Sequence, residues 1–161
     1  MHAPAAYAEP VAGWIRTLKY GGRLGLAATL VEIMDEALDS WLAGHGFDLL
    51  VPVPLHRRRL ADRGFNQALL LARGAGRRHR LPVRARALRR AHPTTPQVGL
   101  ADRQRLANVR DAFLARRRQV AGHRVALVDD VMTTGATADA AARALLRAGA
   151  ESVGVLAVAR A

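Results

Sequence analysis

The fold of this chain is decided by the stretch Val125-Ala126-Leu127-Val128-Asp129-Asp130-Val131-Met132-Thr133-Thr134-Gly135-Ala136-Thr137. Its first four residues are apolar and do not alternate with polar ones, which predicts a strand buried on both faces of a parallel sheet. Two carboxylates then end the predicted strand, and a loop with threonine hydroxyls and a glycine follows. An alanine-rich helix is expected from about Ala138 to Arg147. The stretch therefore predicts the order strand, tight loop, helix.

The loop and the two acids together suit a sugar phosphate. Backbone N–H groups at a helix N-terminus lack partners within the helix and the helix dipole adds positive charge, so a phosphate is a natural ligand there. Gly135 would let the backbone approach that phosphate closely. Asp129 and Asp130 would repel a phosphate, so they suit a sugar diol, a bound cation, or both. Two alternatives stay open: an ordinary capped helix after a strand that ends in acids, and an acid pair that binds magnesium as in receiver domains.

The same stretch resembles the phosphoribosyl pyrophosphate motif of type I phosphoribosyltransferases, which is a hydrophobic strand, two acids and a Thr-Thr-Gly-x-Thr loop. The resemblance implies that Asp129 and Asp130 face the ribose 2- and 3-hydroxyls, and that replacing Asp130 with asparagine weakens ligand binding while leaving the fold intact. It implies that the ribose 5-phosphate binds in the loop of Val131, Met132, Thr133, Thr134, Gly135, Ala136 and Thr137.

Length and composition limit the function classes. The 161 residues fit a single domain, 1–161, that is long enough to bury a sizeable core. No run of eighteen apolar residues occurs, so no membrane span is expected. The N-terminus lacks the charged and apolar regions of a signal peptide, and a cytoplasmic location is the default expectation. Cysteine is absent, which excludes disulfides and thiol catalysis.

Positive charge is concentrated in the middle of the chain. The formal net charge is +12, and residues 57–124 contain nineteen arginines against three acids. A basic face of this size attracts polyanions, and nucleic acid first. The alternative explanation is the composition of a GC-rich genome, with part of the charge on an ordinary solvated surface. Aromatic platforms for single strands are scarce, since only Phe65 and Phe113 lie in this span.

Hydrophobic periodicity predicts further elements around this unit. Helices are expected over 11–20, 24–42, about 62–78 and 102–108, and strands over 47–51, 81–83, 85–90, 109–114 and 152–158. The strand 47–51 runs into Pro52-Val53-Pro54 at the edge where open α/β sheets bind ligands. Trp41 is expected in the core. Lys19 is expected on the solvated surface unless a family resemblance gives it a role.

Several pieces outside the first stretch resemble one subgroup, the ComF competence-protein family, whose members carry a phosphoribosyltransferase domain. In chain order they are Leu18-Lys19-Tyr20-Gly21, Val51-Pro52-Val53-Pro54-Leu55-His56, Arg63-Gly64-Phe65-Asn66-Gln67, and the spaced residues Arg90, Thr94, Gln97, Leu100, Arg103, Asn108 and Val109. Family members commonly begin with a cysteine zinc ribbon, and this sequence has no cysteine, so the family's usual metal site is absent. A truncated chain, a misplaced start codon and a member without the ribbon all stay open.

The resemblance implies an α/β fold of the type I phosphoribosyltransferase kind: a mostly parallel five-stranded sheet flanked by helices, with a small hood. It implies that the segment 90–100 closes over the site as a lid. It assigns pyrophosphate binding to Pro54, Leu55, His56, Arg57 and Arg63, and catalytic roles to Asp129, Asp130, Arg90 and Arg103. The two arginines would offset charge on the leaving pyrophosphate. Magnesium is expected to arrive with phosphoribosyl pyrophosphate, with Asp129 and Asp130 as its candidate protein ligands.

Three functions fit this pattern, and the sequence does not separate them. The first is a magnesium-dependent phosphoribosyltransferase that acts on a base or another nucleophile. The second is a non-catalytic protein that senses phosphoribosyl pyrophosphate while its arginine-rich middle binds single-stranded DNA in natural competence. The third is a regulator that keeps the pocket and has lost the chemistry. A competence helicase and a second copy of the chain, as a homodimer, are further candidate partners.

Overall fold

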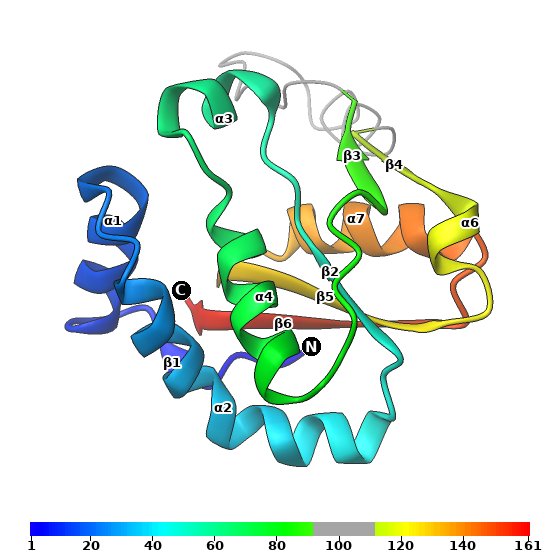
Figure 1. Cartoon of the computed structure of the whole chain (residues 1–161), viewed down its shortest axis with the longest axis horizontal. Helices are drawn as coiled ribbons and strands as arrows, with labels where there is room; N and C mark the ends of the chain where they lie inside the picture. Colours follow the sequence, from blue (N-terminus) through cyan, green and yellow to red (C-terminus); the bar gives the residue numbers. More distant parts are fainter. Residues whose placement is uncertain (92–111) are drawn as a thin grey trace.

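The computed structural model describes residues 1–91 and 112–161. Its centre is a parallel sheet of four strands in the order β1-β6-β5-β2 (Figure 1). The strands are β1 (Ala5–Ala6), β2 (Leu49–Pro52), β5 (Arg124–Met132) and β6 (Ser152–Arg160). β5 pairs in parallel with both β2 and β6. The carboxyl ends of these strands therefore meet at one edge of the sheet.

A single β-bridge pairs with β2 on the side of the sheet where a fifth strand would lie. The N–H of Leu50 donates to the carbonyl of Pro82 at 2.9 Å, and the N–H of Arg84 donates to the carbonyl of Leu50 at 2.9 Å. The strand expected over 81–83 is thus reduced to one parallel bridge, between Leu50 and Val83. Proline is a poor member of a ladder because it has no N–H to donate. The expected five strands correspond, in the described ranges, to four strands and this bridge.

Helices cover both faces of the sheet (Figure 1). One face packs against α1 (Val11–Gly21), α2 (Leu26–His45) and α4 (Gln67–Arg78). The other packs against α7 (Ala136–Arg147) and an antiparallel pair, β3 (Leu88–Arg90) with β4 (Phe113–Ala115). The short helices are α3 (Arg57–Arg63) and α6 (Arg117–Val120). The helix expected over 102–108 lies outside the described residues. No helix within 1–91 or 112–161 has the length and apolar character needed to cross a membrane.

The core consists of two apolar layers, one on each side of the sheet. Successive side chains of a strand point to opposite faces. Val125 and Leu127 of β5 therefore pack on the side of α7 and Phe113, whereas Ala126 and Val128 pack on the side of α1, α2 and α4. All four are fully buried. This confirms the prediction of a strand buried on both faces.

β5 is longer than the sequence predicts. Its ladder with β6 continues through Asp129↔Ala157, Val131↔Ala159 and Met132↔Arg160. The prediction that the two acids end the strand is therefore wrong, and the loop before α7 comprises only residues 133–135. β6 runs alongside and supplies hydrogen-bond partners, and this tertiary pairing overrides the low strand propensity of aspartate.

The segment after β2 forms two helices where one helix preceded by a basic loop was expected. His56 caps α3, because its Nδ1 accepts a hydrogen bond from the N–H of Arg58 at 3.3 Å. Gly64 ends α3 with a left-handed φ of +80°, the conformation that commonly closes a helix. Asn66 then caps α4 by accepting a hydrogen bond from the N–H of Ala68 at 3.0 Å, which is the capping role expected of it.

Candidate functional site

The predicted phosphate loop lies where β5 passes into α7. Thr133 and Thr134 are exposed, as are Ala136 and Thr137 in the first turn of α7. Gly135 begins the helix with a φ of +79° and gives it no side-chain cap. Within the loop, the N–H of Ala136 donates a hydrogen bond to Thr134 Oγ1 at 3.4 Å. The loop thus offers threonine hydroxyls beside the N–H groups of a helix start, an arrangement that suits a phosphate.

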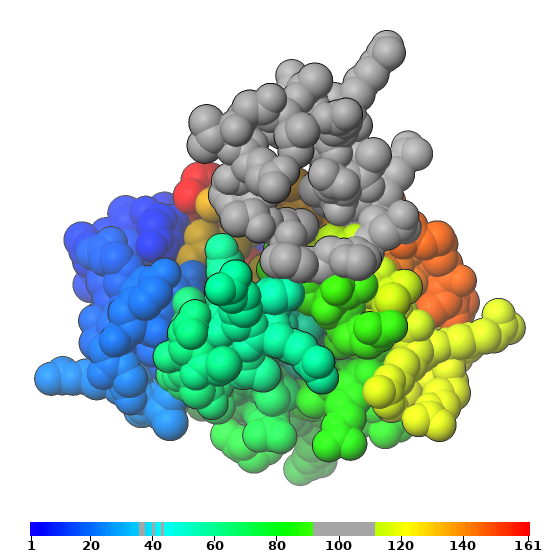
Figure 2. Space-filling model, turned by 90° about the horizontal axis from the view of Figure 1, so that it is seen from above, coloured from blue at the N-terminus to red at the C-terminus, as the bar shows by residue number. Residues whose placement is uncertain are grey.

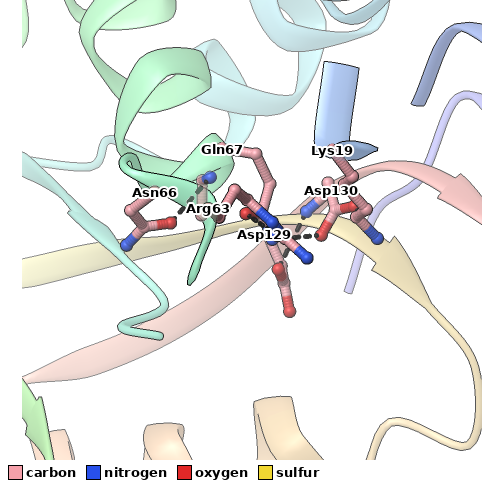
Figure 3. A network of polar contacts seen from close by, with 7 residues as sticks. Lys19, Arg63, Asn66, Gln67, Asp129 and Asp130 are labelled. Atoms are coloured by element: carbon pink, nitrogen blue, oxygen red, sulfur yellow. Dashed lines mark hydrogen bonds and ion pairs between the residues drawn. The ribbon is translucent and has the colours of Figure 1, made fainter. Parts of the chain in front are cut away.

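Asp129 and Asp130 point to opposite faces of β5, because they are neighbours on a strand (Figure 3). Asp130 points to the face covered by α1 and α4. Asp129 points to the other face, and its Oδ1 accepts a hydrogen bond from the backbone N–H of Asp130 at 2.9 Å. The sequence predicts the same ligand role for both acids. The structure gives them different neighbours, so they are unequal as ligand groups.

Asp130 is part of a buried polar network. It is 4% exposed and, with Gln67, is one of two buried polar or charged residues in the part of the chain that the structure describes. Gln67 Nε2 donates to Asp130 Oδ1 at 3.2 Å, and the Lys19 ammonium forms an ion pair with Asp130 Oδ2. Arg63 Nη1 donates to Gln67 Oε1. The network joins α1, α3, α4 and β5 around one carboxylate (Figure 3).

Lys19 is a residue of the candidate site that composition and periodicity did not point to. Its side chain is only 19% exposed, so the alternative that was expected to depend on a family resemblance holds and the lysine is not solvated. A buried charge needs an opposite charge beside it, and Asp130 supplies that charge from a strand far away in the sequence. Two signals could have found it: Lys19 is the single lysine of the chain, and it lies in one of the pieces that carry the family resemblance.

The ionised form of the Asp129 carboxyl is unfavourable in the ligand-free protein. Burial raises the pKa of this carboxyl, and the charge of Asp130 raises it further, to about 8. The charge of Lys19 lowers this pKa, but by less. The surroundings of Asp129 in the ligand-free protein therefore favour the protonated form of its carboxyl. A cation or hydroxyl donors placed beside it would favour the ionised form.

We expect Asp129→Asn to stabilise the protein at alkaline pH. A carboxyl whose pKa rises on folding, here from 3.8 to about 8, stabilises the fold at low pH, and this contribution is lost as the pH rises through the folded-state value. Asparagine stays neutral and avoids the loss. Thermal unfolding should show the two proteins within about 0.5 kcal/mol at pH 5 and the variant more stable by about 1–3 kcal/mol at pH 9.

The control for this prediction is Asp139→Asn, which removes an exposed carboxylate of α7 that pairs with Arg143. It should show no comparable gain between pH 5 and pH 9. A stability difference between wild type and Asp129→Asn that does not change with pH would contradict the raised pKa.

The predicted pyrophosphate segment leaves the sheet at the same edge as the acids, because β2 and β5 are parallel neighbours. Pro54, Leu55 and His56 are half-buried, and Arg57 is exposed at the start of α3. The start of the segment is tied to α4, since Asn66 Nδ2 donates to the carbonyl of Val53 at 3.0 Å. Arg63, at the other end of α3, contacts Gln67 and the Tyr20 ring. Arg63 therefore lies on the side of α1.

Arg90 brings positive charge to the face of Asp129. Its guanidinium carbon lies 5.4 Å from the centre of the Phe113 ring. Burial lowers the pKa of Arg90, the charge of Arg59 lowers it further, and the charge of Asp129 raises it. Arg59, Arg90 and Asp129 therefore lie within electrostatic reach of one another, although they come from α3, β3 and β5. Arg103 and residues 92–100 of the predicted lid lie outside the described residues.

Of the two acids, Asp129 is the candidate ligand for a magnesium ion. Both oxygens of Asp130 are engaged, one by Gln67 and one by Lys19. Among the residues that the structure describes, no three or more His, Cys, Asp or Glu side chains are grouped to hold a metal ion. Magnesium at phosphate sites takes one or two carboxylates together with substrate phosphates. A single carboxylate beside a diphosphate is therefore a sufficient protein ligand.

Known proteins similar to this chain include competence and DNA-utilization proteins. Residues 83–161 match the model of the phosphoribosyl transferase domain. The chain is 32% identical over 160 residues to Competence protein F of Haemophilus influenzae, covering 96% of this chain and 70% of that protein. It is 35% identical over 154 residues to DNA utilization protein YhgH of Escherichia coli, covering 94% of this chain and 67% of that protein.

Solved phosphoribosyltransferase structures share the fold. An adenine phosphoribosyltransferase superposes with a TM-score of 0.57 at 18% identity, over 85% of this chain and 71% of that chain. The glutamine phosphoribosylpyrophosphate amidotransferase of Bacillus subtilis superposes with a TM-score of 0.53 at 23% identity, over 82% of this chain and 26% of that chain. These likenesses concern the fold, and they confirm the type I phosphoribosyltransferase fold expected from the sequence.

Proposed function

Because this chain belongs to the ComF competence-protein family and contains a phosphoribosyl transferase domain, we propose that it binds phosphoribosyl pyrophosphate and transfers the phosphoribosyl group to an acceptor. The observation that carries this proposal is the end of β5. There an exposed threonine loop and the start of α7 lie next to two carboxylates that have different partners.

In this proposal the 5-phosphate lies at the start of α7. The hydroxyls of Thr133, Thr134 and Thr137 donate to its oxygens, and Gly135 allows the turn that brings backbone N–H groups to it. The remaining residues of the motif contribute their backbone to this phosphate site: Val131, Met132 and Ala136. Asp129 accepts hydrogen bonds from the ribose hydroxyls. Asp130 holds Lys19 and Gln67 in position beside the sugar.

Transfer then replaces one bond at ribose C1 with another. A nucleophilic atom of the acceptor donates its electron pair to C1, and the pyrophosphate leaves with the electrons of its C–O bond. Magnesium, when bound with the substrate, would neutralise charge on the diphosphate, with Asp129 as its protein ligand. The backbone of residues 54–56 and the charges of Arg57 and Arg90 would offset the remaining charge. Catalysis of this kind depends on positioning and electrostatics and needs no protein nucleophile.

The experiment that tests the proposal is a calorimetric titration of magnesium phosphoribosyl pyrophosphate into the protein and into the Thr133→Ala/Thr134→Ala double variant. Both threonines are exposed, so their replacement removes phosphate donors without disturbing the network around Asp130. We expect saturable binding that is about ten- to a hundredfold weaker in the double variant, because each lost bond is to a charged ligand.

The matched control for the titration is Ser152→Ala, which removes an exposed hydroxyl at the opposite end of the sheet. Its affinity should equal that of the wild type. A wild-type protein that does not bind the ligand, or a double variant with undiminished affinity, would reject the proposal.

A second candidate function is the binding of single-stranded DNA, and the placement of the arginines favours it. Exposed arginines follow one another along α3, the segment before β3, β3 itself and α6: Arg57, Arg58, Arg59, Arg84, Arg86, Arg89, Arg116, Arg117 and Arg118. In Figure 2 the teal, green and yellow segments that contain them lie next to one another on one side of the molecule. The DNA-utilization protein among the relatives points to the same class of partner.

A further inference from the structure

A pocket of about 440 Å³ lies between the C-terminal end of α1 and the helix α3, and nothing in the phosphoribosyl motif accounts for it. It is lined by Lys19, Tyr20, Arg59, Asp62, Arg63 and Phe65. The volume is within the range of sites for small organic ligands, about 300–1,000 Å³. Figure 1 shows the two helices that contribute most of this lining, α1 in blue and α3 in green.

Two side chains that line this pocket are also connected to Asp130 of the β5 motif. Lys19 lines the pocket and forms the ion pair with Asp130. Arg63 also lines it and donates to Gln67, which in turn donates to Asp130. Figure 3 shows Lys19 and Arg63 on either side of Gln67 above the strand that carries Asp130. A ligand in the pocket would therefore lie next to a sugar held at the end of β5.

The pocket has a net positive lining. Lys19, Arg59 and Arg63 contribute cations, whereas Asp62 contributes the one carboxylate among the six lining residues named above. Lys19 is already neutralised by Asp130. Arg63 is held by Gln67 and the Tyr20 ring, so Arg59 is the arginine left to face a ligand. Arginine forks match the two oxygens of a carboxylate. The charge therefore favours a ligand with an anionic group.

The pocket also offers an aromatic surface. Tyr20 is 79% exposed, which is unusual for a large ring at the end of a helix packed on the core. The Arg63 guanidinium lies 5.3 Å from the centre of the Tyr20 ring, and this contact limits the freedom of both side chains. Phe65 lines the same pocket. A planar ring placed against Tyr20 would bury apolar surface that the protein leaves in water.

We propose that this pocket binds the acceptor of the phosphoribosyl group, and that the acceptor is a planar heteroaromatic acid: a ring with a nucleophilic nitrogen and a carboxylate. The inference rests on the proposed function. Arg59 binds the carboxylate, the ring packs on Tyr20, and the ring nitrogen faces the sugar beside Asp130. The nitrogen donates its electron pair to C1, the pyrophosphate leaves with the electrons of the C–O bond, and the N–H proton passes to water.

The test uses orotate, a pyrimidine carboxylate, and uracil, which is the same ring without the carboxylate. Each is titrated into the full chain with and without saturating magnesium phosphoribosyl pyrophosphate. We expect orotate to bind at least tenfold more tightly than uracil. Tyr20→Ala should weaken orotate at least tenfold and leave the affinity for phosphoribosyl pyrophosphate unchanged. Arg59→Gln should also weaken orotate at least tenfold. Arg58→Gln is the matched control, because Arg58 is the neighbouring exposed arginine of α3 and does not line the pocket.

The outcomes separate this inference from the function on which it rests. Binding of phosphoribosyl pyrophosphate with no preference for orotate over uracil would overturn the acceptor site and leave the proposed function standing. Orotate binding that inorganic pyrophosphate abolishes and Tyr20→Ala does not change would assign the pocket to pyrophosphate. An oligothymidylate that binds in place of orotate, and is lost in Tyr20→Ala, would assign it to a nucleic-acid strand. Failure of phosphoribosyl pyrophosphate to bind would overturn both proposals.

Discussion

Asp130→Asn should destabilise the fold by about 3–5 kcal/mol, which is the usual cost of leaving one partner of a buried ion pair alone. The Lys19 ammonium would stay between α1 and β5 with 19% of its side chain exposed and no opposite charge on Asp130. Asparagine keeps the size of the side chain and an oxygen that can accept a hydrogen bond from Gln67 Nε2. The lost stability therefore reports on the ion pair alone. This prediction differs from the expectation, drawn from the sequence, that the substitution leaves the fold intact.

Urea unfolding monitored by circular dichroism measures this cost. Lys19→Met should lose a similar amount, because it leaves the buried Asp130 carboxylate alone. The double variant should lose clearly less than the sum of the two single variants, since neither charge then stays unpaired. Strict additivity would show that the two side chains do not interact.

An exposed ion pair provides the control for this cycle. Arg16 and Glu9 form a salt bridge with both side chains largely in solvent. Arg16→Gln should change stability far less than Asp130→Asn, because solvent screens an exposed ion pair. The contrast between the two pairs would attribute the large effect to burial and exclude a general sensitivity to charge removal.

Binding of single-stranded DNA, the second candidate function, should weaken steeply with salt. Each phosphate contact on a single strand releases about 0.7 of a counterion, so six contacts give a log–log slope of about −4. The affinity would then fall about 250-fold between 50 and 200 mM salt. Fluorescence anisotropy with a labelled oligothymidylate at several salt concentrations measures the slope.

A triple substitution at α6 locates the contacts. Arg116, Arg117 and Arg118 are consecutive and exposed, and their replacement by glutamine should reduce the slope by about 2. The matched control removes Arg16, Arg23 and Arg143, which are exposed arginines outside the basic span, and should leave the slope nearly unchanged. A flat salt response of the wild type, or equal effects of the two triple variants, would reject a specific arginine face.

The residues from Val125 to Thr137 determined much of this protein by themselves. Their apolar run, two acids and threonine loop predict a buried parallel strand, a tight turn and a following helix, and the structure contains these three in this order. Local signals of this kind are readable because backbone propensity and hydrophobic burial act on neighbouring residues. The capping role of Asn66 was readable for the same reason.

Tertiary structure alone decided how the two acids differ. β6 extends β5 beyond Val128, so the strand alternation sends Asp129 and Asp130 to opposite faces. Two residues from other parts of the chain then pair with Asp130: Lys19 through an ion pair and Gln67 through a hydrogen bond. Burial, in contrast, raises the pKa of Asp129. Charge compensation acts through space between residues that packing brings together, and no local pattern of the sequence specifies that distance.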